Sequence, residues 1–244
     1  MLKEILVKKK AQEDLSNEPK LIKNKYKSNS LKKALEKREN ALIGEIKFKS
    51  PSEGKIIEEE LENLVRKMEK LNSLSILTES NYFNGSIDYL DRVKEIYKKP
   101  VLRKDFIYDK RQLYQTKRHK ADAVLLITSI LGEKLTEFVQ LSNKLKLDPL
   151  VEVKTKKELD LALKTKTKLI GINNRNLETL GINLERTKKL SQYIPEEITT
   201  VSESGIKDIK DIKELEDYCD AFLIGTAFMK SNNLEKKVDK FLCA

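Results

Sequence analysis

The sequence is short of the residues that build disulfide and metal sites. Its 244 residues include two cysteines, Cys219 and Cys243, and one histidine, His119. Two late thiols supply neither a disulfide framework nor a four-cysteine zinc site, and one histidine excludes a multi-histidine metal centre. A histidine-dependent catalytic triad would have to use His119. Acid–base chemistry therefore falls to lysine, glutamate, aspartate or tyrosine.

Long apolar runs are also absent. The longest runs have about five or six residues, as at Ala123–Ile127, whereas a membrane span needs roughly 20. The first residues, Met1-Leu2-Lys3-Glu4, lack the apolar region and cleavage site of a secretory signal. With 39% hydrophobic and 36% charged residues, the composition is typical of a soluble globular protein. We expect a cytoplasmic protein without a membrane partner.

The net charge of +10 raises the question of an anionic partner. The lysines are spread along the whole chain, and no segment interleaves them with aromatic residues as single-strand-binding grooves do. We expect no nucleic-acid partner. The alternative, a basic nucleic-acid-binding protein, predicts binding that weakens steeply with salt, which a gel shift at two ionic strengths would detect.

A repeating pattern follows a polar, lysine-rich N-terminal segment. Residues 1–40 show weak helical periodicity and are expected to form a helical extension; residues 41–244 are expected to form the catalytic domain. Eight short apolar runs alternate with amphipathic stretches of helical spacing, which predicts a parallel sheet covered by helices. The runs are Ala41–Ile46, Leu74–Leu77, Val101–Leu102, Ala123–Ile127, Leu150–Val153, Leu169–Ile172, Ile198–Val201 and Ala221–Ile224.

Eight such units suit an α/β protein of the (β/α)8 TIM-barrel class better than an open, doubly wound sheet. No G-x-G-x-x-G follows the first run, which removes the main support for a dinucleotide-binding fold. Polar groups follow every run, and in a barrel these strand ends share the rim where active sites form. They are Glu45 and Lys47, Thr78 and Glu79, Lys104 and Asp105, Thr128, Glu152, Asn173 with Arg175, Glu203 with Ser204, and Gly225 with Thr226.

The first group can be oriented from its spacing. Side chains along a strand alternate between faces, so Ile43, Glu45 and Lys47 point one way, and Ile46 and Phe48 point the other. If the first set faces the barrel axis, Glu45 and Lys47 lie in its top layers. A buried ion pair contributes little stability, which favours a functional role over a structural one.

At this point the motifs resemble those of the indole-3-glycerol phosphate synthases. Residues 45–54, E-I-K-F-K-S-P-S-E-G, resemble the E-x-K-x-x-S-P-S-x-G signature of that family's first strand, and further segments match in order. These include Leu77-Thr78-Glu79 with Tyr82-Phe83-Asn84-Gly85-Ser86, Pro100–Ile107 (P-V-L-R-K-D-F-I), Ala121–Ile127, Leu150–Val153, Gly171–Leu177 (G-I-N-N-R-N-L), Val201–Ile206 (V-S-E-S-G-I) and Leu223–Thr226.

Three features depart from the family pattern. Phe48 stands at a position that is often basic, and its side chain would weaken anion binding there. Lys154 follows Glu152 and Val153 where histidine is common. The N-terminal extension is short and diverged, which bears on its role as a lid.

The resemblance implies a cofactor-free and metal-free lyase of tryptophan biosynthesis. It would close the ring of 1-(2-carboxyphenylamino)-1-deoxyribulose 5-phosphate, release carbon dioxide, and remove water to give indole-3-glycerol phosphate. No step is a redox reaction or a group transfer, so no cofactor is needed. We expect a monomer whose partner is this phosphorylated small molecule, and which associates with other tryptophan-pathway enzymes. A fused isomerase domain is not expected after the eighth unit.

The resemblance also implies roles for individual residues. Lys104 matches the acid of ring closure, with a pKa that we expect the cations Lys47 and Arg175, or burial, to lower. Glu152 matches the base of dehydration. The remaining catalytic residues are Lys47, Glu45, Asn173 and Glu203; the substrate-binding residues are Ser50, Phe83, Phe106, Leu125, Arg175 and Ser204; the phosphate-binding residues are Lys47, Gly205, Gly225 and Thr226.

Two interpretations stay open. For Phe83, Phe106 and Leu125, ordinary barrel packing explains the residues as well as an aromatic slot does. A different phosphate-binding barrel, such as a phosphoribosylanthranilate isomerase, would share the fold and the phosphate site. That enzyme would not need the set of Glu45, Lys47, Lys104 and Glu152.

Overall fold

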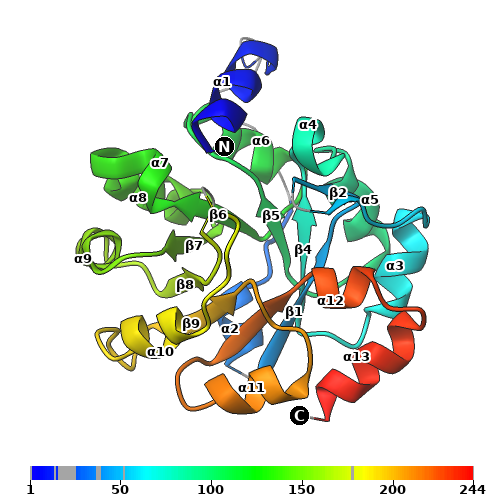
Figure 1. Cartoon of the computed structure of the whole chain (residues 1–244). Coiled ribbons are helices and arrows are strands. Elements are labelled where there is room, and N and C mark those ends of the chain that lie inside the picture. Colours follow the sequence, from blue (N-terminus) through cyan, green and yellow to red (C-terminus); the bar gives the residue numbers. More distant parts are fainter. Residues whose placement is uncertain are drawn as a thin grey trace.

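Eight parallel strands close into a barrel in the order β1-β10-β9-β8-β7-β6-β5-β4 (Figure 1). The computed structural model describes residues 2–13, 15, 26–36, 40–51, 53–176 and 179–243. The barrel strands are β1 (Ala41–Ile46), β4 (Ser73–Leu77), β5 (Val101–Lys104), β6 (Ala123–Ile127), β7 (Asp148–Val153), β8 (Leu169–Asn173), β9 (Thr199–Glu203) and β10 (Ala221–Ile224). The predicted barrel is confirmed, and only the run Ile198–Val201 begins ahead of its strand, by one residue.

Helices connect each strand to the next around the outside of the barrel (Figure 1). They are α3 (Leu61–Lys67), α4 (Ser80–Phe83), α5 (Tyr89–Ile96), α6 (Arg111–Arg118), α7 (Thr128–Leu131), the 3-10 turn η1 (Gly132–Lys134), α8 (Leu135–Lys144), α9 (Lys156–Lys164), α10 (Glu185–Ser191), α11 (Ile209–Leu215), α12 (Thr226–Met229) and α13 (Leu234–Leu242). A small antiparallel hairpin of β2 (Lys49–Ser50) and β3 (Gly54–Lys55) follows β1. Across the described ranges, no helix has the length and apolarity needed to cross a bilayer.

The barrel strands are buried on both faces, which explains their nearly continuous apolar sequences. Successive residues of β1 alternate between two cores. Ile43 packs inside the barrel with Leu102 and Leu125, whereas Leu42 and Ile46 pack outward against the helices. The predicted alternation of β1 is therefore confirmed, and it directs Glu45 inward.

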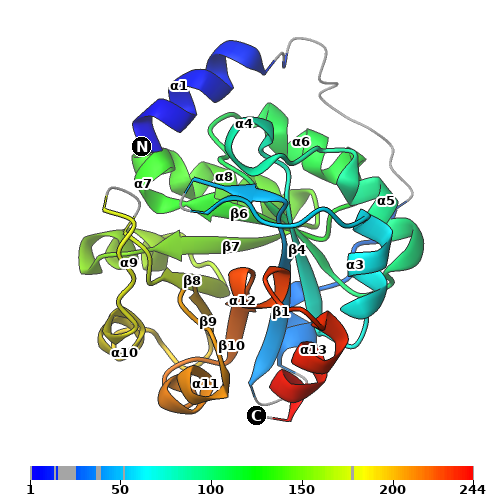
Figure 2. The same cartoon turned by 45° about the vertical axis from the view of Figure 1, so that its right-hand side comes forward.

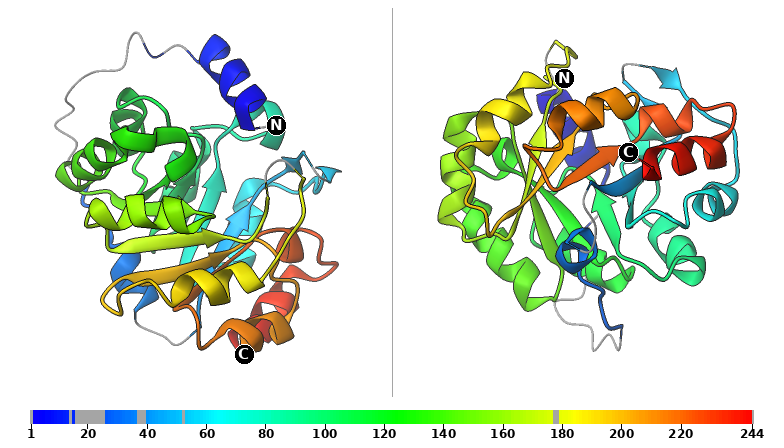
Figure 3. Two further views of the ribbon diagram at one scale, coloured as in Figure 1. Left: turned by 60° about the vertical axis from the view of Figure 1, so that its left-hand side comes forward. Right: turned by 90° about the horizontal axis from the view of Figure 1, so that it is seen from below.

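Two helices precede the barrel and lie at its opposite ends (Figures 2 and 3). In α2 (Leu31–Leu35), Leu31 and Leu35 are fully buried in the core inside the barrel, at the end where the strands begin. Ser30 caps this helix by accepting a hydrogen bond from the Lys33 backbone N–H, and its hydroxyl donates to Asp148. In α1 (Leu2–Gln12), Ile5 packs into the same interior core from the other end.

Candidate active site

Four charged residues form a layer across the top of the barrel interior. Glu45, Lys104, Glu152 and Glu203 come from β1, β5, β7 and β9, which are alternate strands of the ring. Alternate strands supply the side chains of one interior layer in such barrels, and branched apolar residues usually fill it. Here the layer holds three carboxylates and one ammonium group, all largely buried. A charged layer at this depth points to chemistry rather than to stability.

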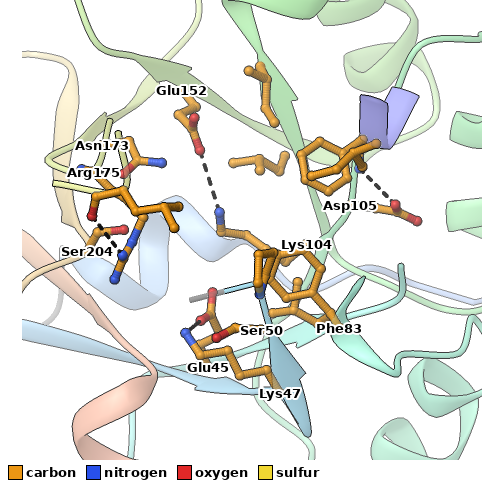
Figure 4. Close-up of a pocket in the computed structure, with 17 residues that line it drawn as sticks. Glu45, Lys47, Ser50, Phe83, Lys104, Asp105, Glu152, Asn173, Arg175 and Ser204 are labelled. Atoms are coloured by element: carbon orange, nitrogen blue, oxygen red, sulfur yellow. Dashed lines mark hydrogen bonds and ion pairs between the residues drawn. The ribbon is translucent and has the colours of Figure 1, made fainter. Parts of the chain in front are cut away.

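Lys104 lies at the centre of this layer. Its Nζ is 3.2 Å from Oε2 of Glu203 and 3.5 Å from Oε2 of Glu152. Figure 4 shows its side chain extending across the pocket toward Glu152. Both oxygens of Glu203 and Oε1 of Glu152 are buried and accept no well-aligned hydrogen bond among the described groups, although Oε2 of Glu203 and Oε1 of Glu152 lie in ion pairs. Ion pairs with lysines therefore hold these carboxylate oxygens, which keep acceptor capacity for a substrate.

Two glycines make room for the carboxylates of this layer. A Cβ atom at Gly171 of β8 would lie 2.0 Å from Oε1 of Glu203. At Gly225, directly after β10, a Cβ atom would lie 2.4 Å from Oε1 of Glu45 and 3.0 Å from Nζ of Lys47. Glu45 and Lys47 themselves form an ion pair of 2.7 Å (Figure 4). A Cβ atom at either position would therefore displace these charged groups.

The charges of the layer move one another's pKa values in opposite directions. Burial lowers the pKa of Lys104, but Glu203, Glu152 and Glu45 raise it by more, so the net shift is upward. The expectation that Lys47 and Arg175 lower this pKa is wrong, because the three carboxylates around the ammonium dominate and raise it.

The pKa values of the two glutamates beside Lys104 shift in opposite directions. Burial raises the pKa of Glu203 to about 7, with Glu152 adding to the effect and Lys104 opposing it. Burial also acts to raise the pKa of Glu152, but Lys104 and Lys154 together bring it below its ordinary value. At neutral pH, Glu152 is therefore ionised, whereas Glu203 is partly protonated.

An apolar pocket opens above the charged layer. Its lining includes Phe83, Phe106 and Leu125, together with Ser50, Arg175 and Ser204. The rings of Phe83 and Phe106 have centroids 6.2 Å apart. Glu45, Lys47, Lys104, Glu152 and Asn173 also line this pocket. The structure thus brings every residue expected to bind the substrate to one cavity, although their individual roles stay predictions.

A second, adjoining pocket lies over the loops after β9 and β10. Ser204, Gly205, Gly225 and Thr226 line it, as do Glu203, Lys47 and Arg175. Ser204 and Gly205 have φ values of 67° and 99°, a backbone conformation that directs successive N–H groups to one side. With the nearby ammonium and guanidinium groups, this turn has the chemistry to hold a phosphate.

A buried hydrogen-bond network braces that turn from below. Asn174 donates from Nδ2 to the Ser204 carbonyl oxygen at 3.2 Å and to the Ser202 hydroxyl at 3.0 Å. The hydroxyl of Thr187 donates to Oδ1 of Asn174 at 2.9 Å. Asn174, Thr187 and Ser202 have no exposed surface. Fully satisfied networks of this kind hold a strained turn in one conformation.

The end of β8 is fixed by its own contacts. Oδ1 of Asn173 accepts a hydrogen bond from the Arg175 backbone N–H at 2.9 Å. Arg186 of α10 donates to the Asn173 carbonyl oxygen at 2.6 Å. The Arg175 guanidinium donates to the Leu180 carbonyl oxygen (Figure 4). The backbone of Arg175 also forms an isolated antiparallel β-bridge with Ile182. Asn173 is thereby held at the first pocket, and Arg175 is held where it lines both pockets.

Helix α1 is attached beside the site by a buried lysine. Nζ of Lys9 lies 3.0 Å from Oδ1 of Asp105 and 3.4 Å from Glu13. Asp105 also accepts hydrogen bonds from Arg103 at 2.8 Å and from the Thr78 hydroxyl at 2.6 Å. Burial opposes ionisation of Asp105, but Lys9 and Arg103 hold its pKa well below the ordinary range. Thr78 and Asp105, which follow two strands, thus anchor this helix.

Several residues that line the pockets were not predicted as site residues, although some lie in the quoted motifs. They are Ile5, Pro51, Leu77, Ile127 and Leu180 in the first pocket and Glu53, Ile182, Ile206, Lys207, Leu223, Ala227 and Lys230 in the second. Ile127 could have been found, because it lies two residues after Leu125 on β6 and so faces the same side. Leu180 and Lys230 carry no such signal, because they lie in loops whose path depends on the fold.

Other expectations need correction or fall outside the described residues. Phe48 packs edge-on against Tyr89 and lines neither pocket. The expectation that this residue weakens anion binding is therefore wrong, because its side chain lies outside the anion site. Glu79 caps α4 by accepting from two backbone N–H groups. Ser52 and Leu177 of the motifs are not described. In the described ranges, His, Cys, Asp and Glu side chains form no group of three that could hold a metal ion.

Solved structures of low sequence identity share the fold. A thiamine phosphate pyrophosphorylase from Pyrococcus furiosus superposes with a TM-score of 0.63 at 14% identity, covering 88% of this chain and 96% of that one. KGPDC from Streptococcus mutans gives a TM-score of 0.62 at 13% identity, with 84% of this chain and 97% of that one covered. At such identities the likeness supports the barrel alone.

Sequence relatives are much more similar. A family model for indole-3-glycerol phosphate synthase matches residues 2–241. The indole-3-glycerol phosphate synthase of Thermoanaerobacter sp. (strain X514) is 44% identical over 98% of this chain and 93% of its own length. That of Aquifex aeolicus is 40% identical over 99% and 98%. The tryptophan biosynthesis protein TrpCF of Buchnera aphidicola is 38% identical, over 96% of this chain and 50% of that protein. The chain therefore belongs to the indole-3-glycerol phosphate synthase family, the carboxy-lyases that form indole-3-glycerol phosphate in tryptophan biosynthesis.

Proposed function

We propose that this site performs the three steps of indole-3-glycerol phosphate synthesis with Lys104 as the acid and Glu152 as the base. The observation that carries the proposal is the position of the Lys104 ammonium, within 3.5 Å of both Glu152 and Glu203. It lies between an apolar pocket and an anion-binding turn that together match a substrate with an aromatic ring at one end and a phosphate at the other.

The two pockets suggest how the substrate lies. Its phosphate contacts the backbone N–H groups around Gly205, Gly225 and Thr226, and Lys47 adds a charge-assisted hydrogen bond. Its aromatic ring enters the slot formed by Phe83, Phe106 and Leu125. Ser50, Arg175 and Ser204 anchor the polar groups between these ends. The ribulose carbonyl then lies over the charged layer, where the bonds change.

Ring closure requires a positive charge at the carbonyl oxygen. The aromatic carbon that bears the carboxylate attacks the carbonyl carbon, and negative charge develops on the oxygen. Because its pKa is raised in the free site, Lys104 is fully protonated before the reaction and stabilises this charge electrostatically. Its proton moves to the oxygen as the alkoxide forms. Loss of carbon dioxide then returns the electron pair to the ring.

Dehydration requires a base and a departing hydroxyl group. Glu152 is ionised at neutral pH, because Lys104 and Lys154 offset the effect of its burial, and it accepts the ring proton. Before ring closure Lys47 orients the substrate carboxylate; in dehydration it donates a proton to the departing hydroxyl, while Glu45 holds Lys47 in place. Asn173 and Glu203 contact the ribulose hydroxyls near the reacting carbons.

We also infer that the protein works in the cytoplasm as a monomer and associates with neighbouring enzymes of the pathway. Support for association comes from the Buchnera protein, a tryptophan biosynthesis protein of which this chain matches half. Size-exclusion chromatography with light scattering of the chain alone would test the monomer; a stable dimer would contradict it.

The assignment of Lys104 is tested with Lys104→Met, which keeps the length of the side chain and removes its charge. We expect turnover, followed by indole fluorescence, to fall about 10²–10⁴-fold, the range for loss of a general acid. Lys110→Met, at an exposed lysine shortly after the same strand, is the matched control and should keep full activity. Activity within a few-fold of wild type in Lys104→Met would contradict the assignment.

Glu152→Gln separates the two halves of the reaction. Ring closure should then proceed further than dehydration, so a decarboxylated intermediate should accumulate and be seen by mass spectrometry in quenched samples. An unchanged ratio of intermediate to product would argue against Glu152 as the base. If wild-type protein gave no indole product but converted phosphoribosylanthranilate, the isomerase would be the correct activity.

A further inference from the structure

Lys154 is a largely buried lysine beside the charged layer, and the mechanism above gives it no step. It directly follows β7 and lies two residues after Glu152, so its side chain leaves the chain on the same side. Its backbone N–H donates to Oε2 of Glu158 at 2.7 Å, and the Thr155 hydroxyl accepts from the Glu158 N–H at 3.2 Å. This helix start fixes the direction in which Lys154 extends.

The ammonium of Lys154 faces only one of the two glutamates beside Lys104. Its Nζ lies 3.3 Å from Oε1 of Glu152, while Nζ of Lys104 lies 3.5 Å from Oε2 of the same carboxylate. Each oxygen of Glu152 therefore has its own cation. Among the described ion pairs, Glu203 has Lys104 alone, at 3.2 Å. The two glutamates thus receive unequal numbers of positive charges.

This inequality decides where a proton goes. Lys47 is paired with Glu45, so without Lys154 one ammonium would serve both Glu152 and Glu203. Buried carboxylates that share a site do not both stay ionised, and their titrations are coupled. A further cation beside one of them places the negative charge there and leaves the proton on the other.

We propose that Lys154 is a positioning residue that selects which glutamate of the pair is the base: it keeps Glu152 ionised and leaves the proton on Glu203. The inference rests on the proposed role of Glu152 in dehydration. Lys154 lines neither pocket, so it acts through the carboxylate of Glu152 and not on the substrate.

The surroundings of Glu152 support this assignment. Four polar side chains face Glu152: Lys104 of β5, Lys154 directly after β7, Asn173 of β8 and Glu203 of β9. Strand β6 contributes the apolar side chains Leu125 and Ile127 to the same pocket. Glu45 of β1 acts on Lys104 and Glu203. Of these groups, Lys154 is the cation that Glu152 does not share with Glu203.

The test is Lys154→Met, with the glutamate carboxyl carbons labelled with ¹³C and followed by NMR against pH in the substrate-free protein. Glu152→Gln and Glu203→Gln identify the two signals. An opposite charge within roughly 4–6 Å moves a carboxyl pKa by about one to three units. We therefore expect the Glu152 midpoint to rise by at least about one unit in Lys154→Met and the Glu203 midpoint to fall.

The pH profile of kcat/KM provides the functional measurement. Glu152 must be ionised to act as a base, so in Lys154→Met the acidic limb of the kcat/KM profile should move to higher pH by about one unit. Below that limb, kcat/KM should fall about tenfold. KM above the limb should stay unchanged. Lys154→Arg should restore both the limb and the NMR midpoints. Lys156→Met, at an exposed lysine two residues further on, is the matched control and should change nothing.

Each outcome discriminates. Unmoved NMR midpoints in Lys154→Met, or an activity loss equal at every pH, would overturn the inference and assign Lys154 to packing. If the NMR midpoints of Glu152 and Glu203 move but the acidic limb of kcat/KM does not, Lys154 does select which glutamate is ionised. That result would instead contradict the role of Glu152 as the base. If Lys154→Met does not fold, Lys154→Gln gives the same comparison with a smaller polar side chain.

Discussion

Glu203 occupies space that only a glycine leaves free. A Cβ atom at position 171 would meet Oε1 of Glu203 at 2.0 Å, far inside van der Waals contact. We expect Gly171→Ala to displace this carboxylate and the Lys104 ammonium with it. Turnover should fall about tenfold or more, since small misplacements of reacting groups are costly, and destabilisation should stay near ~1–3 kcal/mol. Steady-state kinetics and thermal unfolding measure the two effects.

The matched control is Gly181→Ala, where the nearest atom would lie 3.4 Å from the new Cβ. This variant should keep its turnover. Wild-type kinetics in Gly171→Ala would mean that Glu203 tolerates displacement and contributes little to the reaction.

The sequence identified many site residues but not their electrostatics. Strand alternation alone oriented Glu45 and Lys47, and motif resemblance located Lys104, Glu152 and Glu203. The direction of the Lys104 pKa shift could not be predicted, because it depends on three carboxylates brought together from three other strands. Only the closed barrel sets those distances.

At the scale of elements, two buried residues place α1 beside the substrate pocket. Its buried residues are Ile5 and Lys9, and Lys9 pairs with Asp105, next in sequence to Lys104. Ile5 lines the substrate pocket. This buried ion pair therefore links the attachment of the helix to the shape of the apolar pocket, beside the more exposed hydrogen bonds that Glu4 and Glu13 accept.

We expect Lys9→Ala to release α1 while leaving the barrel folded. Removing one partner of a buried ion pair costs about 3–5 kcal/mol, because Asp105 is left buried without the ammonium of Lys9. Amide hydrogen exchange should accelerate across residues 2–13 and stay slow in the barrel strands, and KM should rise because Ile5 leaves the pocket.

Lys3→Ala removes an exposed lysine of the same helix and serves as the control. Unchanged exchange across residues 2–13 in Lys9→Ala would show that the ion pair is not what attaches the helix.

The eight strands were predictable because their apolar runs are buried on both faces. The end of β5 was not, since Arg103 and Lys104 do not look like strand residues in isolation. Helices α4, α7 and α12 have four residues each. That is about one helical turn, so the sequence shows no helical periodicity from which they could be predicted. The hairpin of β2 and β3 lies in a polar segment without alternation.

For the whole molecule, Glu203 gives stability an unusual pH dependence. Its pKa is about 7 in the folded protein against an ordinary 4.5, so between these values the folded state binds more protons than the unfolded one. Its contribution is full below pH 4.5 and is lost as the pH rises through 7. The loss should be on the order of 3 kcal/mol relative to Glu203→Gln, which stays neutral.

Urea unfolding of both proteins at about pH 5 and about pH 8, on either side of the folded-state pKa, measures this difference. The comparison with Glu203→Gln is needed because groups with lowered pKa values, such as Asp105, change stability in the opposite direction. Parallel pH dependences of the two proteins would refute the prediction.

Among the described residues, apolar side chains fill the barrel interior below the charged layer. They include Ile43, Leu102 and Leu150, and Leu31 of α2 closes the base. A bound substrate covers the other end, and the four charges then lose contact with bulk water. Protons given by Lys104 and accepted by Glu152 must circulate inside this chamber until product leaves. Because release of carbon dioxide from a carboxylate consumes one proton, the charged groups of the site must take up one proton from solvent in each turnover, after the product leaves.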